Sequence, residues 1–290
     1  RSSFLNSFTQ NLLAGKTRLQ YSHLNLSARA LLIAHAREQT GKNVLVITPD
    51  DLLAEDYWDD FCVLSGRENA HYLPDFEVLP YEERSPHYSI RATRLETIAH
   101  TVSDNPQIYT LSMRTLLRWM QPFELLQKNI LTLRKGMEID PAVLISDLVG
   151  MGYESDYQVS KVYQFAKRGG ILDIFSPPQT KPFRLEFFGD EIVSVRSFSL
   201  STQRSDAGEL EQVTIIPARE LSLHDISVDS PLLERVHDQG FFEGIENCIG
   251  LLFPSVQIFP EYFDPAKTII FWSDFPYILE EQKELAEQVA

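Results

Sequence analysis

The sequence predicts an α/β protein with a parallel-sheet domain, a small inserted α+β domain and a return segment of α/β type. Three observations predict this. Strand-length and helix-length patterns alternate in the first third of the chain, which is typical of a parallel sheet. Three short apolar runs separated by turn residues then favour an antiparallel meander. Two buried-strand patterns, residues 213–217 and 268–272, follow near the end. We expect domain boundaries at residues 1–122, 123–212 and 213–290.

The first domain begins with an amphipathic helix over residues 3–14. A strand–loop–helix–strand unit follows, and its second strand, VLVIT at residues 44–48, has the composition of a buried parallel strand. The remaining expected elements are strand 18–21, helix 28–38, acidic helix 50–61, extended segment 71–84, helix 89–102, strand 107–111 and helix 114–120.

The loop before helix 28–38 is where a nucleotide-binding domain would hold phosphate. Here it reads Ser-His-Leu-Asn-Leu-Ser over residues 22–27, without the required Gly and Lys. Gly15-Lys16-Thr17 is no substitute, because Gln10 stands where the phosphate-loop motif needs Gly and the preceding run is helical. Strand 107–111 lacks the acidic pair that would hold Mg²⁺. We therefore expect no catalytic, cofactor-binding or metal-binding residues in this chain, and Arg29 on the helix surface.

The second domain centres on the meander, whose strands are expected at residues 169–175, 183–188 and 192–198, after strand 130–133 and helix 140–149. Side chains of a strand alternate between its two faces. Phe183, Leu185 and Phe187 therefore share one face, which we assign to the core. The opposite, solvated face carries Arg184, Glu186 and Phe188.

An Arg and a Phe on one solvated face have the composition of an interface hot spot. From Tyr157 to Leu185 there are five Lys or Arg residues and one acidic residue, Asp173, in a chain of net charge −15. This local positive charge favours a binding surface. An ordinary solvated strand with one exposed Phe is the alternative.

Composition limits the remaining possibilities. A net charge of −15 and a pI near 4.9 argue against duplex DNA as the main partner of this chain. The two cysteines, Cys62 and Cys248, lack metal-site spacing and indicate a reducing, cytoplasmic compartment. No apolar run is long enough to span a membrane. The chain starts with Arg1 and ends in a helix-like run, so we expect a piece of a longer protein.

Several motifs together resemble the N-terminal region of the bacterial transcription-repair coupling factors (Mfd). They are LPDFEVLPYEERSPH (73–87), RGGILDIF (168–175), FRLEFFGDEI (183–192), Gln203-Arg204, VTIIPARE (213–220) and EGIENCIGLLFP (243–254) followed by TIIFW. The resemblance implies a UvrB-type module related to the P-loop NTPases. Its parts would be a degenerate motor-like domain 1A (1–122), an inserted domain 2 (123–212) and domain 1B (213–290).

The resemblance also implies a function. In this family the inserted domain binds the damage-recognition protein UvrA through two arginines and a phenylalanine, which match Arg168, Arg184 and Phe188. The chain would be a non-catalytic adaptor that recruits UvrA to stalled RNA polymerase. The longer parent would bind RNA polymerase and double-stranded DNA, and would be a helicase-like DNA translocase that hydrolyses ATP with Mg²⁺ in domains outside this chain.

The alternative is an ATP-dependent damage-verification protein like UvrB. UvrB has a functional phosphate loop and a tyrosine-rich DNA-gripping hairpin. This chain has the loop at residues 22–27 and only a short segment between Tyr81 and Ile90, and both departures favour the coupling factors. A third possibility is a structural domain that restrains the absent motor and does not bind UvrA.

Overall fold

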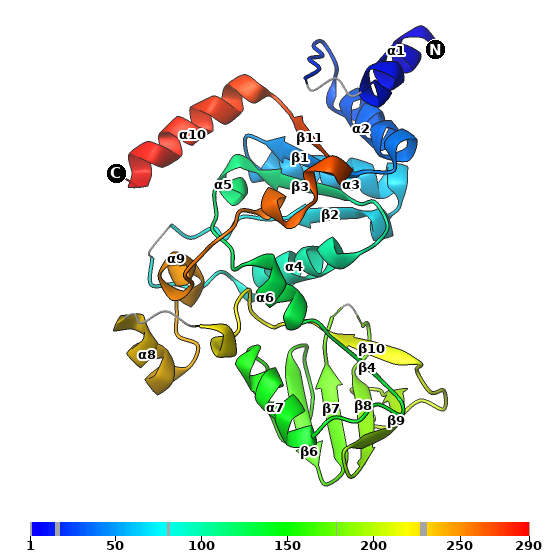
Figure 1. Cartoon of the computed structure of the whole chain (residues 1–290), viewed down its shortest axis with the longest axis vertical. Helices are drawn as coiled ribbons and strands as arrows, with labels where there is room; N and C mark the ends of the chain where they lie inside the picture. Colours follow the sequence, from blue (N-terminus) through cyan, green and yellow to red (C-terminus); the bar gives the residue numbers. More distant parts are fainter. Residues whose placement is uncertain (1, 15–17, 80–81, 178, 227–230, 290) are drawn as a thin grey trace. The chain divides into compact units, whose positions relative to one another are not determined.

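The first and last segments of the chain come together in one parallel sheet (Figure 1). The chain divides into one unit formed by Arg1–Pro80, His100–Trp119 and Ile258–Ala290, and a second formed by Tyr81–Ala99 and Met120–Gln257. The second unit is thus inserted into the first. The structure is a computed structural model and describes residues 2–14, 18–79, 82–177, 179–226 and 231–289.

The sheet of the first unit has the strand order β11-β1-β3-β2, and every pairing in it is parallel. This confirms the expected α/β class. Its strands are β1 (Asn43–Thr48), β2 (Ala70–Leu73), β3 (Ile108–Ser112) and β11 (Thr268–Trp272). β11 is an edge strand, so Ile270 and Trp272 remain 42% and 45% exposed. The expectation that this strand is buried is therefore wrong.

Two helices of the first unit begin at residues whose side chains cap them. The Asn25 side chain accepts a hydrogen bond from the Ala28 N–H at the start of α2, and Gly41 ends this helix with φ of 62°. Asp50 caps α3 in the same way, through the Leu53 N–H. The helices are α1 (Ser2–Leu13), α2 (Leu26–Thr40), α3 (Asp51–Ser65), α5 (Met113–Leu116) and α10 (Phe275–Val289).

The strand expected at residues 18–21 does not form. β1 pairs instead with β11, with Asn43 opposite Thr268, so its neighbour comes from the far end of the chain. The helix expected at residues 114–120 is also shorter than predicted, because α5 ends at Leu116.

The second unit contains a five-stranded sheet with the order β5-β6-β7-β8-β9. The predicted antiparallel meander is confirmed as β7 (Ile171–Phe175), β8 (Phe183–Phe188) and β9 (Glu191–Ser197). β6 (Gln164–Arg168) pairs antiparallel with β7, and the short β5 (Glu154–Ser155) pairs parallel with β6. Gly169 and Gly189 occupy the β6–β7 and β8–β9 turns with φ of 61° and 63°, a left-handed conformation that glycine adopts without steric cost.

The helix α7 (Pro141–Gly150) packs on one face of this sheet around a core that includes Leu144, Leu148, Leu172 and Leu185. The Asp140 side chain caps α7 by accepting from the Ala142 N–H at 2.7 Å, and Pro141 fills the first helical position. The other helices of this unit are α4 (Tyr88–Ala99), α6 (Phe123–Lys128), α8 (Pro231–Gln239) and α9 (Ile249–Leu252).

The predicted strand at residues 213–217 is present as β10 (Gln212–Ile215), but it pairs antiparallel with β4 (Leu131–Arg134) and does not join the parallel sheet. Val213 and Ile215 are buried in the same core as the five-stranded sheet. The three expected domain boundaries therefore remain a prediction, and the structure itself separates only the two units described above.

Candidate partner-binding site

A buried carboxylate organises the face of the five-stranded sheet opposite α7. Asp173 on β7 is a direct cross-strand partner of Arg184 on β8. Arg184 Nε donates to Asp173 Oδ1 at 2.6 Å, and Arg184 Nη2 donates to Oδ2 at 2.9 Å. The Asp173 side chain is fully buried, and its hydrogen bond raises the pKa of the Arg184 guanidinium above its usual value. This is a two-point ion pair, the strongest geometry available to Arg and a carboxylate.

Arg168, the last residue of β6, joins the same pair. Its Nη2 donates to Asp173 Oδ2, so two guanidinium groups meet one carboxylate. The Arg168 side chain is 39% exposed, whereas that of Arg184 is 13% exposed. The structure therefore brings the two predicted arginines together, and only Arg168 has much of its side chain in solvent.

Further contacts explain why Arg184 is covered. Its guanidinium lies 4.9 Å from the centre of the Phe198 ring, and Nη1 donates to the Gln203 carbonyl oxygen at 3.4 Å and to Ser205 Oγ at 3.3 Å. The expectation that Arg184 lies on a solvated face is wrong. The loop that follows β9 covers this part of the sheet and leaves the arginine side chain mostly buried.

Phe188 lies at the end of β8, beside the β8–β9 turn, and is 80% exposed, as the alternation predicts. Its neighbour Phe187 is partly buried against the core on the other face. A bulge between Glu186 and Phe187 shifts the pairing with β9 without exchanging the two faces. Because a strand rises about 3.4 Å per residue, Phe188 lies roughly 13 Å along β8 from Arg184. The three predicted residues thus share one face, with Phe188 at its edge.

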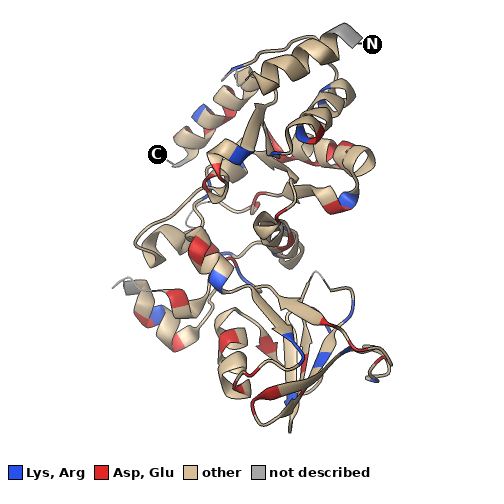
Figure 2. Cartoon of the chain, turned by 45° about the vertical axis from the view of Figure 1, so that its right-hand side comes forward, with Lys and Arg blue, Asp and Glu red and all other residues tan. Residues whose placement is uncertain are grey.

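Most of the local positive charge is neutralised by ion pairs, and two of the five cations have their partners outside the segment that predicted it. Lys161 pairs with Glu154 at 2.8 Å, and Lys181 pairs with Asp206 at 2.9 Å. Figure 2 shows acidic residues beside basic ones on this unit. Within the described part of the chain, Lys167 is the one cation of the five that forms no ion pair. The patch is therefore less positive than the sequence suggests, and its free charge is at the β6–β7 turn.

Asp173 was missed as a site residue. It is the one acidic residue within an apolar strand and among five cations, and this pattern was a usable signal for a buried ion pair.

In the first unit, the position expected for a nucleotide phosphate holds an ion pair. Arg29 in the first turn of α2 donates from Nη1 to Asp274 Oδ2 at 2.7 Å and to Ser273 Oγ at 3.1 Å. Its Nε donates to the Leu24 carbonyl oxygen at 2.9 Å. Arg29 is therefore held by a carboxylate and is not a free surface residue. Gly15-Lys16-Thr17 lies outside the described residues.

The described residues contain neither a cluster of metal ligands nor a helix that could span a membrane. Nowhere in residues 2–14, 18–79, 82–177, 179–226 and 231–289 do three or more His, Cys, Asp or Glu side chains come together as metal ligands would. Over the same residues, the helices are too short or too polar to cross a membrane.

The second unit thus presents a mainly antiparallel sheet that is backed by α7 on one face and carries an exposed Phe and ion-paired arginines on the other. Residues 131–221 match the family model of the UvrB interaction domain. The chain is 34% identical to the transcription-repair-coupling factor of Haemophilus influenzae over 70% of its length, and 30% identical to those of Escherichia coli and Staphylococcus aureus over 77% and 72%. The chain belongs to the transcription-repair-coupling-factor family as its N-terminal, UvrB-like module, which confirms the resemblance. It spans 18–19% of these relatives' length.

Proposed function

We propose that this chain is a non-catalytic adaptor module that binds UvrA through the surface formed by Arg168, Arg184 and Phe188. The observation that carries the proposal is the position of Phe188, which is 80% exposed on the segment that matches an interaction domain. A large exposed apolar ring beside arginines is the composition that supplies binding energy at protein interfaces.

The three residues have different tasks in this proposal. Phe188 is buried against the partner, and Arg168 offers its remaining N–H groups to a partner carboxylate. Arg184 is a positioning residue, because it holds the Asp173 carboxylate to which Arg168 also binds. Loss of Arg184 would weaken binding by releasing Arg168 and loosening the sheet.

The first unit has a supporting role that is not catalytic. Its relationship to P-loop NTPases is part of the proposal, together with the division into domains 1A, 2 and 1B. The Arg29–Asp274 ion pair at the start of α2 occupies the place where a phosphate would bind a motor domain. This supports an adaptor without nucleotide or Mg²⁺, and disfavours the UvrB-like, ATP-dependent alternative.

The longer parent, in this proposal, is an ATP-driven DNA translocase of the cytoplasm that engages stalled RNA polymerase and double-stranded DNA. Its ATP and Mg²⁺ would bind in domains outside this chain. The module would then bring UvrA to the stalled polymerase. This supplies the link between transcription and repair that the name of the related transcription-repair-coupling factors describes.

The test is a calorimetric or optical binding titration of the 290-residue chain against cognate UvrA. We expect saturable binding by the wild-type chain and at least about 30-fold weaker binding by Phe188→Ala, the change that corresponds to a hot spot of 2 kcal/mol. Tyr277→Ala is the matched control, since Tyr277 is a 63% exposed aromatic residue of the first unit. Absence of wild-type binding would refute the adaptor.

A further inference from the structure

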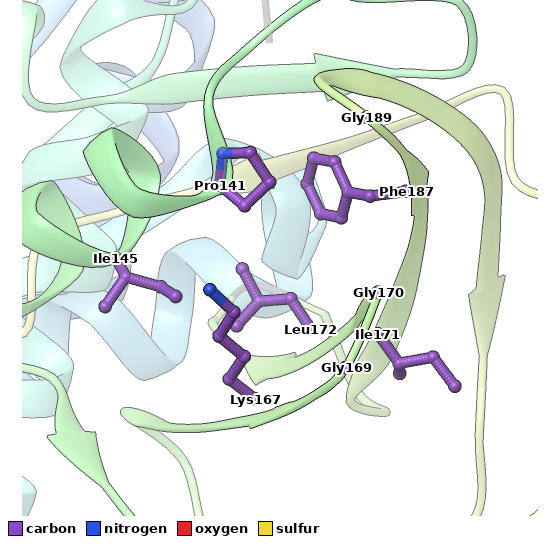
Figure 3. Close-up of a pocket in the computed structure, with 9 residues that line it drawn as sticks. All are labelled: Pro141, Ile145, Lys167, Gly169, Gly170, Ile171, Leu172, Phe187 and Gly189. Atoms are coloured by element: carbon purple, nitrogen blue, oxygen red, sulfur yellow. The ribbon is translucent and has the colours of Figure 1, made fainter.

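A small cavity opens on the α7 side of the five-stranded sheet, at the end where the β6–β7 and β8–β9 turns lie (Figure 3). Its volume is about 150 Å³. The apolar walls come from α7, through Pro141 and Ile145, and from the sheet, through Leu172 and Phe187. An apolar cavity of about this size can hold one benzene-sized group. It is therefore large enough for a single apolar side chain.

Glycines lie at the mouth of the cavity. Gly169 and Gly189 line it, and a Cβ atom added to either would meet no atom within 4 Å. A Cβ at Gly170 would lie 3.0 Å from the Phe187 carbonyl oxygen, so this turn packs closely against β8. The Phe187 N–H also donates to the Gly170 carbonyl oxygen at 2.8 Å. The two turns thus form one firm rim around an open entrance.

One charged side chain, that of Lys167, reaches into this partly apolar cavity. Figure 3 shows Lys167 extending from β6 between Ile145 and Leu172, with its Nζ atom directed into the cavity. Lys167 is exposed and forms no ion pair with the residues that the structure describes. An ammonium group at the entrance of an apolar cavity attracts a group that is apolar and has a carboxylate beside it.

The cavity adjoins the proposed binding surface residue by residue. Lys167 and Arg168 are consecutive on β6, and Phe187 and Phe188 are consecutive on β8, so each pair has one member on each face of the sheet. Lys167 and Phe187 line the cavity, whereas Arg168 and Phe188 belong to the proposed binding surface. A partner that covers Phe188 and extends around this edge of the sheet would reach the entrance of the cavity.

We propose that the cavity is a subsite of the UvrA-binding surface and that it takes one apolar side chain of UvrA, with an adjacent UvrA carboxylate paired to Lys167. This inference rests on the proposed function and adds to it a determinant of partner choice. UvrA would then hold the edge of the sheet from both faces, with Phe188 buried on one face and its own side chain buried on the other.

Two variants of the 290-residue chain test the subsite against cognate UvrA. Ile145→Phe fills the cavity, and we expect at least about 10-fold weaker binding, because one buried apolar group is lost. Val143→Phe is its control, since Val143 is a 52% exposed residue of the same helix. Lys167→Met removes the charge, and we expect about threefold slower association with a weaker salt dependence. Lys181→Met is its control, and both controls should bind within about twofold of the wild type.

The melting temperature of each variant shows whether it keeps the fold. If Ile145→Phe unfolds the chain, the subsite is tested by comparing the association rates of Lys167→Met and Lys181→Met. Wild-type binding that is lost in Phe188→Ala but unchanged in both Ile145→Phe and Lys167→Met would overturn the subsite and leave the adaptor in place. If wild-type chain and UvrA do not bind at all, the proposed function fails and the subsite fails with it.

Discussion

Asp173 and Arg184 face each other across β7 and β8, and two hydrogen bonds of 2.6 and 2.9 Å join them in the middle of the sheet. The carboxylate is fully buried, so it depends on its cationic partners for stability. Arg184 is consequently part of the fold as well as of the proposed binding surface. Phe188, at the edge of the same face, is free of this double role.

The first prediction concerns this ion pair. We expect Arg184→Ala to lower the free energy of unfolding by about 3 kcal/mol, because it leaves a buried carboxylate short of a partner. Arg204→Ala, at an exposed position, should change it by less than about 0.5 kcal/mol. Urea unfolding measures both. If Asp173 and Arg184 are coupled, the double variant loses less stability than the sum of the single variants. Additive losses would show that they do not interact.

The second prediction separates the two neighbouring phenylalanines. Phe188→Ala should leave the melting temperature nearly unchanged and weaken UvrA binding, because its ring is 80% exposed. Phe187→Ala should cost about 2 kcal/mol of stability, less than the 3–5 kcal/mol of a fully buried phenylalanine, because its ring is only partly buried. Thermal unfolding and binding titrations on both variants give the comparison. Unfolding by Phe188→Ala alone would place the strand in the opposite register.

The third prediction concerns the buried ion pair between Arg94 on α4 and Glu220, whose side chains are 0% and 4% exposed. Arg94→Met should lower the free energy of unfolding by about 3–5 kcal/mol, since Glu220 would remain buried and charged. Lys135→Met is the control, because its pair with Glu209 is exposed to solvent and should contribute little to stability. Denaturant midpoints measure both. Equal effects of the two variants would contradict the importance of burial here.

The fourth prediction concerns pH. Burial, and to a lesser degree the neighbouring His100, lowers the pKa of His71 from 6.5 to about 4. His71 stacks on His100 with ring centres 4.1 Å apart, and its Nε2 is 2.9 Å from Gln107 Oε1. The unfolded chain therefore binds a proton that the folded chain does not between pH 6.5 and 4. Stability is full above pH 6.5 and should fall by about 3 kcal/mol as the pH drops to 4.

The measurement for His71 is urea unfolding at several pH values between 7 and 4. The His71→Gln variant should lose much of the acid sensitivity of the wild-type chain. His237→Gln should keep it, because His237 is exposed on α8. A wild-type stability that does not change over this range would mean that His71 is solvated.

The fifth prediction concerns nucleotide. We expect no saturable ATP binding in calorimetry, because Arg29 holds Asp274 at the start of α2 and the loop at residues 22–27 has no Gly or Lys. Asp274→Asn frees Arg29 but adds no loop to surround a triphosphate, so this variant should not bind ATP either. Micromolar ATP binding that disappears when residues 22–27 are altered would favour the UvrB-like alternative.

Local patterns in the sequence were enough to predict several elements. Alternation in FRLEFF placed Phe183 and Leu185 in the core and Phe188 in solvent, because strand side chains alternate strictly once the strand is known. The turn residue Gly189 likewise acts through neighbours a few residues away. The motifs also predicted the family, because their order and spacing along the chain are together specific to it.

Only the tertiary structure decided which distant segments pair. The sequence could not show that β1 pairs with β11, that β10 pairs with β4, or that residues 18–21 stay outside the sheet, because these outcomes depend on contacts between residues far apart in the chain. The same reason applies to the site. Arg184 looked exposed by its place in the strand, and it is covered because Asp173, Phe198 and the loop after β9 converge on it in space.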